Sequence, residues 1–189
     1  MIERDAEATR QRLLAAATIE FSQYGIAGAR VDRIAAAARS NKAQIYHYFG
    51  SKNGLFDAVF GGHAQAAVEQ EYFDASDLPG TAGWIFDNYE EHPELGRLVL
   101  WYRLERAGDA ASIAALERAN LAKIEKIRAA QEAGLVTDRF PPAVLLGLIL
   151  TLTAAWTALP PEFAVLEREV PAGDRRGYVV AAVRRLVEP

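Results

Sequence analysis

The chain has 189 residues, of which 51% are hydrophobic and 24% are charged, and its formal net charge is −4. These proportions are ordinary for a soluble globular protein. The chain has no cysteine, which excludes a disulfide framework and a thiolate zinc site. The N-terminal sequence MIERDAEATRQR is charged from its third residue and lacks the apolar stretch of a signal peptide, so we expect a cytoplasmic protein.

Apolar residues recur at helical spacing along the chain, and no strand-like alternation is sustained, which predicts an all-α fold. The first predicted helix runs from about Asp5 to Tyr24, and Gly25 is placed to end it. Asn41 is a suitable N-cap for a third helix, and Ser51 for a fourth. The buried faces of the second, third and fourth helices are predicted to contain Val31, Ile34, Ala35, Ala38, Ile45, Tyr48, Phe49, Leu55, Phe56 and Val59.

The run from Val31 to Phe56 is the most informative part of the sequence. It contains two short helical stretches separated by Arg39-Ser40-Asn41. This is the layout of a helix-turn-helix, whose second helix lies in the major groove of DNA. Residues 30–52 contain five Lys or Arg against Asp32 alone, about +4, within a chain of net charge −4. A basic segment in an acidic chain is typical of a phosphate-binding site.

The C-terminal part is predicted to be a further set of helices. Residues 74–83, DASDLPGTAG, are rich in turn formers and predict a linker. Helices are then expected at about 84–91, 93–106, 109–134, 142–159 and 174–187, with a short helix around 163–166 as an option.

One apolar segment raises the question of a membrane. Residues 141–161 carry no charge, and the apolar run AVLLGLILTLTAAWTAL within them is close to the length that spans a bilayer, roughly 20 residues. The segment contains three threonines, has a proline pair at each end, and has no counterpart elsewhere in the chain. A helix that is apolar on all sides is otherwise buried on all sides. We therefore favour an interface between two copies of the chain, with a membrane span as the alternative.

Residues between 10 and 60 match a known motif in a single register. The matching positions are Leu13, Ala17, Phe21, Gly25, Ile34-Ala35-Ala36-Ala37-Ala38, Ile45-Tyr46-His47-Tyr48-Phe49, Ser51-Lys52 and Leu55-Phe56. This pattern resembles the TetR family of transcriptional regulators. The resemblance implies an all-α homodimer with an N-terminal three-helix helix-turn-helix domain for operator DNA and a larger helical domain that dimerises and holds a small effector. The corresponding division is a DNA-binding domain at 1–52, a linking helix at about 53–73, and an effector-binding and dimerisation domain at 74–189.

The chain departs from the family motif at the turn and at two helix caps. Arg39 stands where the family commonly has glycine, and if that position needs a positive φ, arginine is strained by roughly 1 kcal/mol. No Ser or Thr caps the second helix, because Ala29 and Arg30 precede Val31. Asn41 replaces the usual serine cap of the third helix, which is a conservative change.

The predicted DNA contacts surround the recognition helix. Gln44 is the candidate for reading a base edge, since its amide can bond bidentately to adenine, and Ala43 can touch a thymine methyl. Lysine and tyrosine beside a groove-lying helix reach phosphate oxygens. Plain solvated charge is the alternative for the two lysines and for Arg30 and Arg39; His47 can instead be a packing residue, and Asn41 only a cap. The full set is Arg30, Arg39, Asn41, Lys42, Ala43, Gln44, Tyr46, His47 and Lys52.

The C-terminal half is rich in aromatic residues, most of which we expect in the core. Apolar pockets with a few polar groups between helices are common small-molecule sites. We expect a pocket for a small apolar or aromatic effector, lined by Tyr89, Trp101, Tyr102, Glu105, Ile124 and Trp156. Gly61-Gly62 interrupts the linking helix, either as a hinge or as a point of close packing against a neighbouring helix.

Dimerisation bears on DNA recognition, because two heads about one helical turn apart, roughly 34–36 Å, can read a palindromic operator. The predicted dimer interface lies on the last two long helices and comprises Val144, Leu148, Thr151, Leu152, Ala155, Tyr178, Ala182, Val183 and Leu186.

An enzyme is the main rival class. The three histidines are scattered without metal-binding spacing, and the chain has no P-loop, no GxGxxG after a strand and no GxSxG elbow. We therefore expect no catalytic activity, no cofactor and no metal. The sequence predicts a sequence-specific transcriptional regulator, in this family most often a repressor released by a small molecule. The alternative is a helical small-molecule-binding or interaction protein that does not bind an operator.

Overall fold

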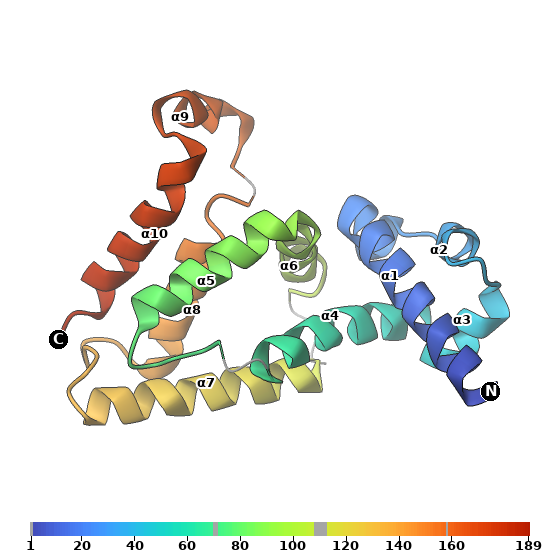
Figure 1. Cartoon of the computed structure of the whole chain (residues 1–189), viewed down its shortest axis with the longest axis horizontal. Coiled ribbons are helices and arrows are strands. Elements are labelled where there is room, and N and C mark those ends of the chain that lie inside the picture. The colour runs from blue at the N-terminus through green and yellow to red at the C-terminus, as the bar shows by residue number, and fades with distance from the viewer. Residues whose placement is uncertain (1, 70–71, 108–112, 158) are drawn as a thin grey trace. The chain divides into compact units, whose positions relative to one another are not determined.

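A computed structural model describes residues 2–69, 72–107, 113–157 and 159–189, and every regular element in these ranges is helical (Figure 1). The all-α prediction is confirmed. The chain divides into two compact units, the first formed by Met1–Gln65 with Arg97–Leu116 and the second by Ala66–Gly96 with Glu117–Pro189. This division differs from the predicted break near residue 74, because α4 (Lys52–Glu69) and α6 (Pro93–Glu105) each contribute to both units.

The first unit begins with α1 (Ile2–Gly28), α2 (Val31–Ala37) and α3 (Lys42–Phe49), followed by α4. Both predicted caps are confirmed. The Asn41 side chain accepts a hydrogen bond from the Gln44 backbone N–H at 3.0 Å, and Ser51 Oγ accepts one from Gly54 N–H at 2.9 Å. The helical backbone of α1 breaks at Gly25, which has φ 71° and ψ −178°, and a further turn then runs to Gly28.

The core of the first unit follows the predicted apolar positions. Leu13, Ala17, Phe21, Ile34, Ile45, Leu55 and Phe56 are fully buried. The rings of Phe21 and Phe56 meet edge to face at 5.2 Å, a geometry worth about 0.5–1.5 kcal/mol beyond burial. Tyr102 of α6 adds to this core, since its ring stacks on Phe60 at 4.7 Å.

The second unit contains α5 (Leu78–Glu91), most of α7 (Ala114–Glu132), α8 (Pro142–Thr153), η1 (Pro161–Phe163), α9 (Ala164–Glu169) and α10 (Ala172–Val187). The prediction of a linker over 74–83 is wrong in its second half, because α5 already begins at Leu78. Asp77 caps this helix by accepting a hydrogen bond from Gly80 N–H at 2.9 Å, and Pro79 suits its first turn. Asp, Pro and Gly are turn formers, but they are also typical of a helix start.

The core of the second unit lies between α5, α7, α8 and α10, with α10 against α5 and α8. Its fully buried side chains include Ile127, Leu145, Ile149 and Val183. The apolar helix α8 ends at Thr153, which is shorter than the predicted 142–159. Within the described ranges, no helix is both long enough and apolar enough to cross a bilayer.

Candidate DNA-binding site

Helix α3 turns one face into the first unit and the other to solvent. Ile45 is fully buried, whereas Lys42, Ala43, Tyr46 and His47 are exposed, and Tyr46 retains 50% of its accessible surface. Four of the predicted contact residues therefore share the free face of the helix, with the exposed Asn41 at its N-terminus. An exposed helix face with basic and aromatic residues is suited to lie in a major groove.

Gln44 is placed differently from those residues. It is half-buried, and its Oε1 is buried without a hydrogen-bond partner among the described residues. A buried acceptor without a partner costs about 1–3 kcal/mol. Bidentate reading of adenine requires that the amide turn outward, so Gln44 as a base reader remains a prediction.

The two lysines predicted to contact phosphates both have partners within the chain. Lys42 forms an ion pair with Asp32 of α2, in which both side chains are more than half exposed. Lys52 Nζ donates to the backbone oxygens of Ala27 and Ala29 at 2.9 and 3.1 Å. Lys52 thus supports the end of α1, and a phosphate would compete with Asp32 for Lys42.

The start of α2 is held from another helix. Its N-cap residue Arg30 has no side-chain cap, but its N–H donates to Glu20 Oε1 of α1 at 2.8 Å. Arg33 Nε also donates to both Glu20 oxygens, at 2.8 and 3.1 Å. Burial alone raises the pKa of Glu20, but the hydrogen bonds from Arg33 and Arg30 outweigh it, so this pKa lies below its ordinary value. Glu20 therefore satisfies the N–H of the N-cap residue and anchors the first turn of α2 through Arg33, whereas no side chain takes the place of the missing Ser or Thr cap.

The turn between α2 and α3 contains the expected backbone strain. Arg39 has φ 51°, the positive value for which the family commonly uses glycine. Its side chain is exposed, as is that of Arg30, so both remain accessible as predicted phosphate contacts.

The six predicted effector residues are divided between the two units. Trp101, Tyr102 and Glu105 belong to the first unit, whereas Tyr89, Ile124 and Trp156 belong to the second, and all six are half-buried. Trp101 Nε1 donates to Ser22 O at 3.2 Å, and Glu105 accepts from Ala27 N–H at 2.7 Å. These two side chains therefore hold α1, a role that the sequence did not suggest.

Most residues of the predicted dimer face are exposed, but Val183 is buried. Val144, Leu148 and Tyr178 are exposed by 48%, 38% and 58%. Thr151, Ala155 and Ala182 are also exposed, while Leu152 and Leu186 are half-buried. Val183 is fully buried inside the chain, so its placement at the interface is wrong and it belongs to the core. Val183 lies on the buried apolar stripe of α10 together with Val179 and Val187, so this face of the helix packs inside the chain.

The comparisons with known proteins cover both parts of the chain. Residues 13–59 match the family described as bacterial regulatory proteins, tetR family, and residues 77–185 match the tetracyclin repressor-like C-terminal domain. The chain belongs to the TetR family. The HTH-type transcriptional repressor SCO4008 of Streptomyces coelicolor is 36% identical over 194 residues, with all of both chains covered.

Two further proteins are similar to this chain, one in structure and one in sequence. The crystal structure of a transcriptional regulator, SCO4942 of S. coelicolor, has a TM-score of 0.81 and 38% identity, covering 95% of this chain and 98% of that one. The HTH-type transcriptional repressor NicS of Pseudomonas putida is 36% identical over 98 residues, which are 48% of this chain and 46% of NicS. TetR-family members are non-enzymatic transcription factors that bind operator DNA and typically act as dimers. This chain is therefore a DNA-binding transcriptional regulator and not an enzyme.

Proposed function

We propose that this TetR-family regulator is a homodimeric repressor that binds a palindromic operator and leaves it when a small apolar or aromatic effector binds. The observation that carries the proposal is the exposed face of α3, which presents Lys42, Tyr46 and His47 beside a buried Ile45. The name of the full-length relative SCO4008 as a repressor supports the direction of regulation.

Contacts between α6 and the end of α1 support a route from an effector to the DNA-binding head. Three residues one turn apart on α6, Arg97, Trp101 and Glu105, form what we call the α6 clamp. Arg97 Nε and Trp101 Nε1 both donate to Ser22 O, at 2.8 and 3.2 Å, and Glu105 accepts from Ala27 N–H. The break at Gly25 frees these backbone groups from helical pairing, and the clamp satisfies them.

A rotation or shift of α6 would therefore act on both sides of the Gly25 break. The same α1 segment is held by Lys52 and leads directly into α2. An effector that binds one position of α6 better than the other shifts the head between two arrangements. Tyr102, which stacks on Phe60, links the same helix to α4.

Gly61 fits the close-packing interpretation of the double glycine. A Cβ at Gly61 would lie 3.3 Å from Ile113 Cγ2, whereas a Cβ at Gly62 would meet nothing within 4 Å. Gly61 therefore allows close approach of the segment before α7. No atom lies close enough to Gly62 to require a glycine there for packing. The hypothesis that the double glycine is a hinge therefore depends on Gly62.

Operator binding is tested with the upstream region of the protein's own gene, by fluorescence anisotropy at several salt concentrations. We expect tight, salt-sensitive binding, and Lys42→Ala should reduce the slope of log K against log salt by about 1. Lys126→Ala, an exposed lysine of the second unit, is the charge-matched control and should change neither affinity nor slope. If wild-type protein binds unrelated DNA equally well, the repressor proposal is wrong.

The effector part is tested with a variant that keeps Trp101 as its sole tryptophan, made by Trp84→Phe and Trp156→Phe. A library of apolar compounds is screened for shifts in emission and in melting temperature. We expect at least one compound to shift both and to release DNA. Compounds that raise the melting temperature without altering Trp101 emission or DNA affinity would argue against a signal through the α6 clamp.

A further inference from the structure

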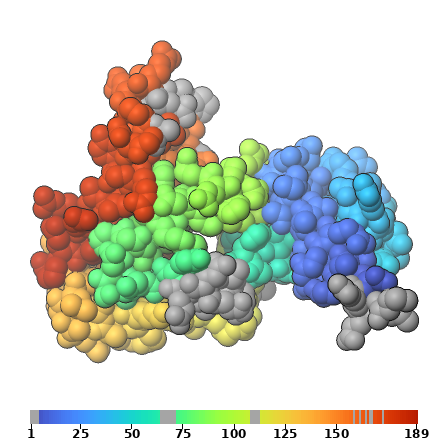
Figure 2. All heavy atoms as spheres, viewed as in Figure 1, coloured from blue at the N-terminus to red at the C-terminus, as the bar shows by residue number. Residues whose placement is uncertain are grey.

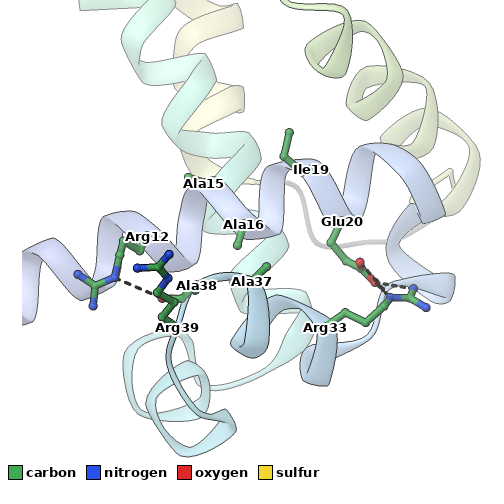
Figure 3. A pocket seen from close by; sticks show the side chains of 9 residues that line it. All are labelled: Arg12, Ala15, Ala16, Ile19, Glu20, Arg33, Ala37, Ala38 and Arg39. Atoms are coloured by element: carbon green, nitrogen blue, oxygen red, sulfur yellow. Dashed lines mark hydrogen bonds and ion pairs between the residues drawn. The ribbon is translucent and has the colours of Figure 1, made fainter.

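A groove runs along the first unit between α1 and the segment formed by α2 and the turn that follows it. It has a volume of about 520 Å³ and is lined by Arg12, Ala15, Ala16, Ile19, Glu20, Arg33, Ala37, Ala38 and Arg39 (Figure 3). The exposed face of α3 does not contribute to it. The groove is therefore a second surface of the head, and Arg39 is the one predicted DNA contact that lines it.

The groove has an apolar centre between two polar ends. Figure 3 shows Ala15, Ala16 and Ala37 between the Arg12–Arg39 end and the Glu20–Arg33 end. Ile19 borders this centre with 51% of its surface exposed. Side chains as small as alanine let another chain approach the helix backbone closely, and Ile19 offers it apolar contact.

The two ends differ in charge. Arg33 is neutralised by Glu20, with Nη2 2.6 Å from Oε1. Arg12 instead donates to Ala38 O at 3.3 Å and to Thr9 Oγ1 at 2.8 Å, and neither Arg12 nor Arg39 has an ion pair with a described carboxylate. The occupant that fits is thus an apolar segment with a carboxylate at one end.

The second unit contains an exposed apolar segment with a carboxylate at one end. In η1 and α9, Phe163 and Val165 are exposed by 46% and 50%, and the neighbouring Glu162 is exposed as well. Figure 2 shows the orange and red atoms of this part of the chain at the surface of the second unit. Phe163 and Val165 can cover Ile19 and the alanines while Glu162 meets Arg12 and Arg39.

We propose that the groove binds the η1–α9 segment of a second copy of this chain, and so joins neighbouring dimers. The contact is heterologous, because one copy gives its groove and the other its segment, so it does not close on itself. A segment of this length buries far less than the roughly 1,200 Å² of a stable interface, so the contact is weak in free solution. It becomes effective when DNA holds two dimers side by side at a high local concentration.

The absence of cysteine from the chain allows a direct test. A full-length Ile19→Cys chain is mixed with a full-length Phe163→Cys chain under mild oxidation, and mixed disulfides are measured on a denaturing gel. We expect them to form at least tenfold faster than with Leu104→Cys in place of Ile19→Cys. Leu104 is the matched control, an apolar residue of the first unit that is 73% exposed and lies outside the groove.

Charge reversal tests the polar end of the contact. Arg39→Glu in the groove chain, or Glu162→Arg in the segment chain, should each slow the mixed disulfide several-fold. Combining the two should restore most of the rate, which a merely structural effect of either change would not do. These rates are measured without DNA, so they are independent of whether Arg39 also contacts an operator.

Two results would overturn the proposal. One is an equal rate for Ile19→Cys and Leu104→Cys. The other is rapid disulfide formation by the Phe163→Cys chain alone, because that would place η1 in the symmetric interface of the dimer. Operator binding by the wild-type chain is measured in parallel, so a failure of the groove contact is distinguished from a failure of the proposed function.

Discussion

The carboxylate of Glu20 on α1 lies 2.8 Å from the backbone nitrogen of Arg30, and it thereby holds the start of a helix to which it does not belong. The same carboxylate holds Arg33, and Glu20 is only 7% exposed. One buried acid thus joins α1 to the start of α2, the first helix of the helix-turn-helix.

Replacing this acid should weaken the fold. Glu20→Gln keeps the size and one acceptor but loses the charge-assisted bonds to Arg33, so we expect the free energy of unfolding to fall by roughly 1–3 kcal/mol. Chemical denaturation at neutral pH measures this loss. Glu7→Gln, which alters an exposed pair with Arg10, is the control and should change stability little.

The same residue predicts a pH dependence. The folded-state pKa of Glu20 lies below its ordinary value of 4.5. Its ionised form therefore stabilises the fold fully above that ordinary value, and the contribution is lost as pH falls through the lowered pKa. The stability difference between wild type and Glu20→Gln should shrink on acidification in this window. A difference that stayed constant down to the acid transition would contradict the assignment.

The strained turn predicts a gain in stability. Arg39→Gly should relieve the positive φ of 51° and raise the free energy of unfolding by about 1 kcal/mol. Arg39→Ala removes the same charge but keeps the strain, so it serves as the control. Equal melting temperatures for the two variants would show that the turn is not strained.

Gly25 and Gly134 both have positive φ, 71° and 69°. Gly25 combines this φ with ψ −178°, a backbone region almost restricted to glycine, so alanine there costs about 1–3 kcal/mol in backbone strain. A Cβ at Gly25 would also overlap Trp101 and Glu105, whereas a Cβ at Gly134 would meet nothing within 4 Å. Gly25→Ala should therefore destabilise the protein by about 1–3 kcal/mol more. Equal losses in thermal denaturation would mean that α6 does not press on this glycine.

Substitutions on α8 and α10 should distinguish a residue of the dimer interface from a residue of the core. Leu148→Asp should leave the chain folded but shift it toward monomers and weaken operator binding, because Leu148 is exposed. Val183→Asp should unfold it, since Val183 is fully buried and an unpaired buried charge is costly. Sedimentation and circular dichroism distinguish the two effects. A dimeric Leu148→Asp variant with normal affinity would place the interface elsewhere.

The sequence predicted most of the head because its signals are local. Asn41 and Ser51 act as caps within three residues of their partners, and the buried positions follow from helical spacing. The Glu20 contact and the α6 clamp were not predictable, because each joins residues that lie far apart along the chain. Residues 78–83 were misassigned to a linker because the sequence Asp-Leu-Pro-Gly, which begins at Asp77, starts a helix with residues that also form turns. Val183 was misassigned because the apolar stripe that it forms on α10 with Val179 and Val187 packs inside the chain, and helical spacing does not say whether such a stripe meets the chain's own core or a second copy.

The central claim is that two copies of α3 read duplex DNA, and selection from random double-stranded oligonucleotides tests it most directly. The purified full-length protein is used at moderate ionic strength, and bound sequences are compared with those bound by Lys42→Ala combined with Tyr46→Ala. We expect a palindrome with half-sites about one helical turn apart, lost in the double variant. Recovery of no preferred sequence by the wild-type protein would contradict the account.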